Sequence, residues 1–236
     1  MTIFKKTLVA LAATAAMAAA QAAPTNVGGV IIDPSSAFDF TGTSAQIYQN
    51  INGITGEVSG YGFVTTLNNT TQGTFAPNGE LTFTFSGYMP GATVGNATYY
   101  SGGLFNVFYD TSKDAGDGSG LTLANASNGV TWLSLVGNGG FSGGATLKGE
   151  TNPGPSLAGF GLLDVVGGLA AYHLDTNGRD NGADLAFTSS FTTVLGPNRY
   201  FGSANFNGNS VPEPASLALL GLGLVGMAMT RRKRSK

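Results

Sequence analysis

Apolar and polar residues alternate in several short segments of this chain. The clearest segment is 81–85, where Leu81, Phe83 and Phe85 are separated by threonines. Successive side chains of a strand point to opposite faces, so this spacing predicts a half-buried β-strand. Weaker versions of the pattern predict further strands at 62–67, 104–109, 130–136, 160–166, 169–174, 184–192 and 200–206. We therefore expect seven or more short strands.

Turn signals lie between these segments. Asn78-Gly79 predicts a hairpin that joins 62–67 to 81–85. Gly167-Gly168 favours a second hairpin over a helix, because each glycine costs a helix about 1 kcal/mol. Short strands at regular spacing are typical of an all-β sandwich or barrel, and we predict a single sandwich or jelly-roll-like domain over residues 23–204. Residues 26–39 are expected to be a flexible lead-in, and the Asn/Gly-rich stretch 205–211 a linker.

Residues 1–22 have the three parts of a secretory signal peptide. Lys5 and Lys6 precede an apolar run from 8 to 20, and Ala20 and Ala22 form a small-x-small cleavage pattern before Ala23. We predict export through the secretion translocon and cleavage by signal peptidase. An uncleaved membrane anchor is the alternative, which the short apolar run disfavours.

Residues 215–230 carry no charge and are rich in leucine. As a helix they would extend about 24 Å at about 1.5 Å per residue, a little less than the hydrocarbon core of about 30 Å. A buried core helix is the alternative, but the following basic cluster would then enter the fold. This cluster is Arg231, Arg232, Lys233, Arg234 and Lys236. We therefore predict a transmembrane helix with its basic end in the cytoplasm.

Val211, Pro212, Glu213 and Pro214 precede this span, and the two prolines predict an extended, exposed strip. Together with the leucine-rich span and the arginine cluster, residues 212–236 resemble the PEP-CTERM sorting signal of Gram-negative bacteria. The resemblance implies recognition by an exosortase, a membrane-embedded cysteine transpeptidase-like enzyme. It also implies a transient inner-membrane anchor, cleavage near Pro-Glu-Pro, and delivery to the cell surface or exopolysaccharide matrix.

Charge is unevenly distributed along the chain. The whole chain has a formal charge of −2, yet residues 23–211 contain four basic and twelve acidic residues. Nucleic-acid binding needs clustered lysine and arginine, so this acidic domain is not expected to bind nucleic acid. The chain has no cysteine and one histidine, which excludes disulfides, thiol catalysis and multi-histidine metal sites. Cations or neutral glycans suit such a domain better.

The strongest acidic cluster lies on the glycine-rich stretch 110–120. Asp110, Asp114 and Asp117 offer the oxygen ligands that calcium prefers, and we name them as a candidate calcium site. A solvated acidic turn is the alternative. A weaker cluster at 175–184 contains Asp175, Asp180 and Asp184, where Arg179 counts against a cation.

Catalytic patterns are weak. The single histidine, His173, is not accompanied by a Gly-x-Ser-x-Gly nucleophile elbow. Glu57, Glu80 and Glu150 could supply a glycosidase pair only if the fold brought two of them together. We expect a protein that is not an enzyme.

Aromatic residues offer either core packing or a sugar-stacking platform. They are Tyr88, Tyr99, Tyr100, Phe105, Phe108, Tyr109, Trp132, Tyr172 and Tyr200. The segments 60–62, 80–83, 131–135, 161–168 and 187–191 also resemble the ectodomains of uncharacterised PEP-CTERM proteins, which implies no activity. The first hypothesis is a structural or adhesive matrix protein without a cofactor. A glycan- or calcium-dependent binding module and a polysaccharide hydrolase are the alternatives.

Overall fold

The computed structural model describes residues 24–36, 40–152 and 156–211, and Pro24–Val211 form one compact unit. The strands in chain order are β1 Thr25–Val27, β2 Val30–Ile32, β3 Phe40–Ile51, β4 Val58–Phe63, β5 Thr66–Leu67, β6 Thr70–Thr71, β7 Glu80–Val94, β8 Ala97–Asp110, β9 Val130–Gly137, β10 Leu147–Thr151, β11 Leu157–Gly167, β12 Leu185–Gly196 and β13 Arg199–Gly208. The α-helices described are two single turns, α2 Gln72–Phe75 and α3 Ala171–Leu174, and two 3-10 turns are η1 Ser142–Gly144 and η2 Asp180–Gly182.

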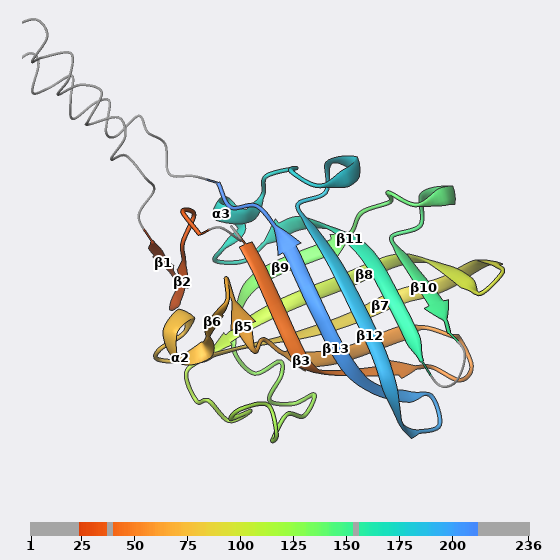
Figure 1. The fold of residues 1–236 in the computed structure, drawn as a ribbon, viewed down its shortest axis with the longest axis horizontal. Helices are drawn as coiled ribbons and strands as arrows, with labels where there is room; N and C mark the ends of the chain where they lie inside the picture. Colours follow the sequence, from red (N-terminus) through yellow and green to blue (C-terminus); the bar gives the residue numbers. More distant parts are fainter. Residues whose placement is uncertain (1–23, 37–39, 153–155, 212–236) are drawn as a thin grey trace, which may run out of the picture. The chain divides into compact units, whose positions relative to one another are not determined.

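Strands β3 to β13 form one large antiparallel sheet that closes on itself, and β1 and β2 form a separate two-stranded sheet. Pairing runs β3-β4-β7-β8, then through β9 and β10 to β11, β12 and β13, and β13 pairs again with β3. Strands β9 and β10 both lie between β8 and β11, where they pair with different parts of these two strands. Figure 1 shows β3, β13, β12 and β11 in the nearer wall, with β7, β8 and β9 behind them. The all-β prediction is confirmed. The sequence left a sandwich or a barrel open within that class, and the structure has one closed sheet.

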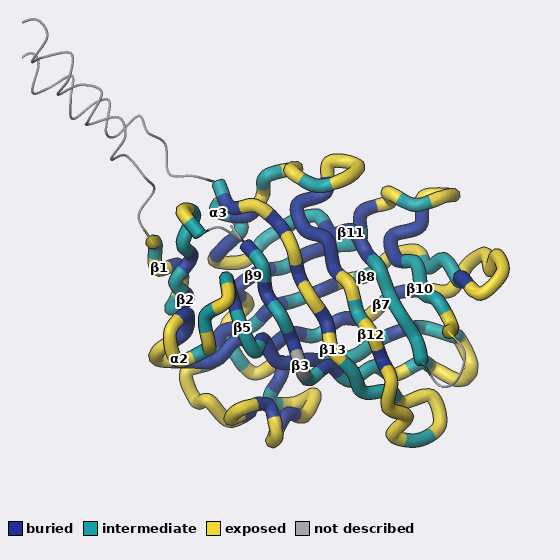
Figure 2. The backbone as a smooth tube through the Cα atoms, in the orientation of Figure 1, coloured by how far each residue is buried: buried dark blue, intermediate teal, exposed yellow. Residues whose placement is uncertain are grey.

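Aromatic side chains fill the interior of the closed sheet. Phe105 lies at the centre, with ring centroids 5.1–6.2 Å from those of its neighbours. These neighbours are Phe83, Phe85, Phe187 and Phe206. Figure 2 shows the resulting alternation of buried and exposed positions along the strands. The period-two pattern at 81–85 therefore marks inward-facing residues, as predicted.

Strand β4 makes room for these rings with glycine. Gly62 lies opposite Phe83 in the neighbouring strand, and a Cβ atom at Gly62 would lie 2.1 Å from the Phe83 ring. Gly60 lies opposite Phe85 in the same way, with the ring 2.3 Å from where a Cβ would be. The two glycines are needed because the ring and a methyl group cannot share this space.

Gly62→Ala is therefore expected to lower the free energy of unfolding by about 1–3 kcal/mol, the usual cost of overpacking a core. Gly73→Ala is the matched control, since Gly73 lies in α2 with nothing within 4 Å of its added Cβ. Urea denaturation of both variants measures the difference. Equal stability of the two variants would show that the Phe83 ring moves aside at little cost.

A small hairpin, β1–β2, packs on one end of the closed sheet. Val27, Val30 and Ile32 are buried in the main core, and the Trp132 Nε1–H donates to the Val27 carbonyl at 2.8 Å. Residues 26–36 are therefore part of the fold, and the prediction of a flexible lead-in is wrong for them. Apolar alternation in Val30–Ile32 was the missed signal.

Other expectations fail locally. Residues 169–174 form no strand: α3 occupies Ala171–Leu174, and Gly168 passes so close to β9 that its added Cβ would lie 2.6 Å from the Trp132 carbonyl oxygen.

Strands β3 and β10 were not predicted. In β3 a register shift opposite Gly202 and Ala204 interrupts the alternation. The prediction of a linker at 205–211 is wrong, because β13 continues to Gly208, Ser210 is buried and the Val211 N–H donates to the His173 carbonyl.

The predicted signal peptide and the predicted transmembrane helix both lie outside the described residues. Among the residues that the structure describes, none belongs to a helix with the length and apolar character needed to cross a membrane.

Candidate functional site

Three carboxylates meet at the outer surface where β7 begins and β8 ends. Glu80 and Asp110 are cross-strand partners in the β7–β8 hairpin, and Asp114 lies on the loop that follows β8. One carboxylate oxygen from each residue lies within 4.8 Å of the other two. Two unit charges at 4.8 Å repel by about 3.5 kcal/mol at an effective dielectric constant of about 20. The cluster therefore favours a bound cation or proton.

The three members differ in burial and in hydrogen bonding. Glu80 is fully buried: its Oε1 accepts the Ala115 N–H at 2.9 Å, and its Oε2 has no partner. Asp114 is exposed and accepts a hydrogen bond from the Asn128 Nδ2 at 2.8 Å. Burial raises the pKa of Glu80, the Ala115 hydrogen bond opposes this, and the charges of Asp114 and Asp110 raise it further.

The structure places two of the three predicted calcium ligands together. Asp110 and Asp114 belong to the cluster, whereas Asp117 is not among its members. The Asp117 side chain instead accepts the Ser119 N–H at 3.0 Å, in a local turn. Glu80 is the third member of the carboxylate cluster instead. Sequence spacing missed Glu80 because it joins the cluster through strand pairing, 30 residues before Asp110.

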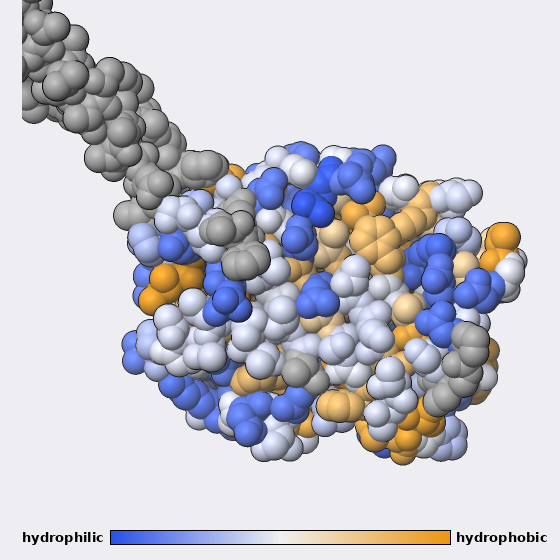
Figure 3. Space-filling view, in the orientation of Figure 1, coloured by the Kyte–Doolittle hydropathy of each residue, from blue (hydrophilic) through white to orange (hydrophobic). Residues whose placement is uncertain are grey.

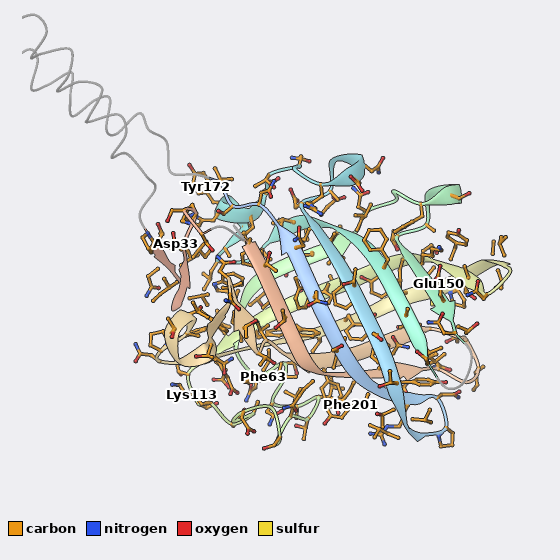
Figure 4. The ribbon with its side chains drawn as sticks, in the orientation of Figure 1. Asp33, Phe63, Lys113, Glu150, Tyr172 and Phe201 are labelled. Atoms are coloured by element: carbon orange, nitrogen blue, oxygen red, sulfur yellow. The ribbon has the colours of Figure 1, made fainter. Side chains whose placement is uncertain are left out.

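The loop 111–129 covers part of the outer face beside this cluster. Ala115, Leu121 and Ala126 bury Phe63 of β4, and the Ala126 carbonyl accepts a hydrogen bond from Thr82 at 3.0 Å. Gln46 of β3 donates to the Asp117 carbonyl at 3.0 Å. Lys113 marks the start of the loop in Figure 4. The loop is thus fixed to β3, β4 and β7.

A groove of about 500 Å³ lies between this loop and the β12–β13 hairpin. Leu123 and Ser127 of the loop line one side, and Leu195 and Arg199 of the hairpin line another. Apolar surface at the lower right of Figure 3 lies at this hairpin tip, where Val194 and Leu195 are each 47% exposed. The volume of the groove lies within the range of about 300–1,000 Å³ that is usual for ligand sites.

Aromatic and hydroxyl side chains from neighbouring strands meet in the groove. Tyr48 and Tyr61 are cross-strand partners with ring centroids 5.0 Å apart and nearly parallel planes. Phe201 packs on the other side of Tyr48, also at 5.0 Å, but does not line the groove, and Thr84 continues the row beyond Tyr61. Burial raises the pKa of Tyr61, Tyr48 adds to this, and Arg199 opposes it. The Tyr61 hydroxyl is therefore neutral at neutral pH.

Four of the nine residues of the predicted aromatic platform belong to the core. Tyr88, Phe105, Tyr109 and Trp132 are buried within the closed sheet, whereas Tyr200 lines the groove. The three aromatic residues of the row, Tyr48, Tyr61 and Phe201, were missed. They could be found only by knowing that β13, β3 and β4 are adjacent.

A smaller hollow lies inside the closed sheet, away from the hairpin β1–β2. Its volume is about 100 Å³, and Ile51, Val58, Tyr88, Leu157 and Phe191 contribute to its lining. It is smaller than the groove on the outer face.

The second acidic segment is structural. Asp184 is 2% exposed and accepts three backbone N–H bonds of 2.6–2.7 Å from Val165, Thr176 and Asn177. These bonds hold the segment 176–184 against β11. Its carboxylate oxygens are already used in these bonds, which argues against a cation there.

The predicted catalytic candidates have other contacts. The His173 ring packs edge-on against Tyr172, with centroids 5.5 Å apart. Glu57 accepts the Gly87 N–H at 2.9 Å, and Glu150 pairs with Lys148. Glu80 belongs to the carboxylate cluster.

The sorting residues start where the described chain ends. The Val211 N–H donates to the His173 carbonyl at 2.7 Å, and Ser210 is buried. The folded domain therefore holds the chain up to the residue before Pro212. Pro212, Glu213, Pro214, Arg231, Arg232, Lys233 and Arg234, and the cleavage residues Ala20, Ala22 and Ala23, lie outside the described residues.

Comparison with protein families gives one match. Residues 210–234 match the family model described as the PEP-CTERM protein-sorting motif, which confirms the resemblance drawn from the sequence. This motif is a substrate signal for exosortase and implies export and membrane-associated processing toward the cell surface. Searches of curated proteins and of solved structures each gave no match. The match covers the C-terminal segment alone, so the role of the closed sheet has to be argued from its surface.

Proposed function

We propose that this chain, as a carrier of an exosortase sorting motif, is a non-enzymatic component of the cell surface or exopolysaccharide matrix. The observation that carries the proposal is the match of residues 210–234 to the sorting motif. In this account an exosortase cleaves the chain near Pro212, Glu213 and Pro214 and releases the folded domain from its anchor. The domain then has a structural or adhesive role in a biofilm or floc.

The folded domain is compatible with such a role. Its compact unit extends from Pro24 to Val211 and contains every strand of the closed sheet. It would therefore keep its core when the C-terminal segment is removed. Closure of the sheet also leaves fewer free edges for non-specific pairing with other chains, which suits a protein displayed at high local concentration.

The experiment compares cells that have the cognate exosortase with cells that lack it. With the enzyme, the protein is expected in the surface and matrix fractions. Without it, the protein is expected to remain in the inner-membrane fraction. The same distribution in both cell types would contradict the proposal. Loss of the protein itself should then weaken cell aggregation, which tests the adhesive role separately.

The groove favours a more specific function, the binding of a neutral glycan. Tyrosine rings, hydroxyl groups and one arginine line it, and sugar rings bind through CH contacts with aromatic rings and hydrogen bonds to hydroxyl groups. The domain carries a formal charge of −8 over residues 23–211, which would repel a polyanionic polysaccharide. We therefore favour an uncharged polysaccharide as the ligand.

Tyr61→Ala is expected to weaken binding of the domain to matrix polysaccharide by about tenfold, equivalent to about 1.4 kcal/mol. Affinity electrophoresis in gels that contain polysaccharide purified from the producing cells measures this change. Tyr172→Ala is the control, because Tyr172 is 74% exposed and does not line the groove. If both variants migrate as the unchanged domain does, the groove is not the glycan site.

A further inference from the structure

We propose that Glu80, Asp110 and Asp114 bind one Ca²⁺ ion, which connects the β7–β8 hairpin to the loop 111–129. Their carboxylate oxygens lie within 4.8 Å of one another. Two oxygens that each lie about 2.4 Å from the same Ca²⁺ are at most about 4.8 Å apart. The spacing is therefore compatible with three ligands of a single ion, and water can complete the coordination.

The second observation is the unsatisfied oxygen of Glu80. Its side chain is fully buried, and its Oε2 has no hydrogen-bond partner, although the Oε1 accepts the Ala115 N–H. A buried carboxylate oxygen without a donor is costly, so native structures rarely leave one. A cation shared with Asp110 and Asp114 would satisfy it.

The charges around the cluster support a cation from solvent. Lys148–Glu150 is the ion pair present among the described residues, so no lysine or arginine pairs with these three carboxylates there. Lys113, which precedes Asp114, donates instead to the Pro77 carbonyl at 2.8 Å. Asp114 is exposed and Asp110 partly exposed, which leaves an approach for the ion. The ligands are all carboxylate oxygens, the type that a hard cation such as Ca²⁺ prefers.

Ca²⁺ binding would also restrain the loop that forms one wall of the groove. Asp114 lies near the start of the loop 111–129, which supplies Leu123 and Ser127 to the groove wall. Asn128, near the end of the same loop, donates a hydrogen bond to the Asp114 carboxylate. An ion at Asp114 would thus hold both ends of the loop against β7 and β8. The calcium site does not rest on the proposed glycan function, and it can be tested without any glycan.

Calorimetric titration of the full chain in detergent with Ca²⁺ alone tests the site. One equivalent is expected, with a Kd of about 0.1–1 mM, the range of extracellular calcium modules. Glu80→Gln and Asp114→Asn should each weaken binding by about tenfold or more, because affinity follows the number of charged ligands. Asp117→Asn is the matched control and should bind as the unchanged chain does.

Three outcomes would overturn the proposal. The first is no heat and no rise in melting temperature at millimolar Ca²⁺. The second is equal weakening by Asp117→Asn and Asp114→Asn. The third is a Glu80→Gln variant that is more stable than the unchanged chain, while Ca²⁺ changes the melting temperature of neither. This result would mean that Glu80 and Asp114 share a proton in place of an ion.

Trypsin gives a second measurement that does not depend on calorimetry. Ca²⁺ is expected to slow cleavage after Lys113, at the start of the loop, and Asp114→Asn should abolish this protection. Cleavage at the same rate with and without Ca²⁺ would contradict the inference.

Discussion

Trp132→Ala is expected to lower the free energy of unfolding by about 3–5 kcal/mol, at the upper end of large-to-small substitutions in protein cores. Trp132 is 1% exposed, and its ring stacks on Phe40 with centroids 6.2 Å apart. Its Nε1–H also donates to the Val27 carbonyl, which holds the β1–β2 hairpin on the end of the closed sheet. The substitution therefore removes a large side chain and the attachment of the hairpin together.

Trp132→Phe separates these two contributions. It keeps most of the packing but leaves the Val27 carbonyl without its donor, so a loss of about 1–3 kcal/mol is expected. Urea denaturation followed by far-UV circular dichroism measures both variants, because Trp132 is the only tryptophan and its fluorescence is lost. A Trp132→Ala domain as stable as the original would show that the hairpin is not part of the folded unit.

Replacing Pro212, Glu213 and Pro214 together with alanine is expected to stop processing at the C-terminus. Two prolines keep a segment extended and unable to continue a helix. Alanine would remove this restriction on the backbone and would also remove the carboxylate of Glu213. The full-length chain should then accumulate in the inner membrane, which fractionation and immunoblotting detect.

Asn209→Ala is the matched control for this variant. Asn209 is exposed and lies just before residues 210–234, which match the sorting motif. It should be processed and displayed as the unchanged protein is. Normal display of the triple-alanine variant would contradict the claim that the Pro-Glu-Pro element is needed for processing.

The all-β class was predictable because it depends on local alternation. Leu81, Phe83 and Phe85 point inward as their period of two requires. Closure of the sheet was not predictable, because it rests on the pairing of β13 with β3, two segments about 150 residues apart. Thr82 also illustrates this limit: it faces outward but is buried, because the loop 111–129 covers it.

The carboxylate cluster could be predicted only in part, because strand pairing brings one of its three members to the other two. Asp110 and Asp114 lie close in sequence and close in space. Glu80 joins them only through the register of β7 and β8, whereas Asp117 is near in sequence but turns into its own local hydrogen bonds. Likewise, the row formed by Tyr48, Tyr61 and Phe201 exists only across three paired strands.

The sorting motif, in contrast, was fully visible in the sequence because it is a continuous signal. Its parts follow one another in the sequence as a Pro-Glu-Pro element, an apolar span and a basic end, and they need no tertiary contact to be identified. The structure adds that the fold extends to Val211, which the His173 carbonyl holds by a hydrogen bond. An exosortase would therefore act on the segment directly next to a folded domain.

Mass spectrometry of the protein recovered from the cell surface tests the central claim most directly. The account predicts a mature chain that begins at Ala23 and ends near Pro212, Glu213 and Pro214, without the span 215–230 and the basic tail 231–236. Recovery of surface protein that still carries Arg231–Lys236 would contradict it, because exosortase processing would then not have taken place.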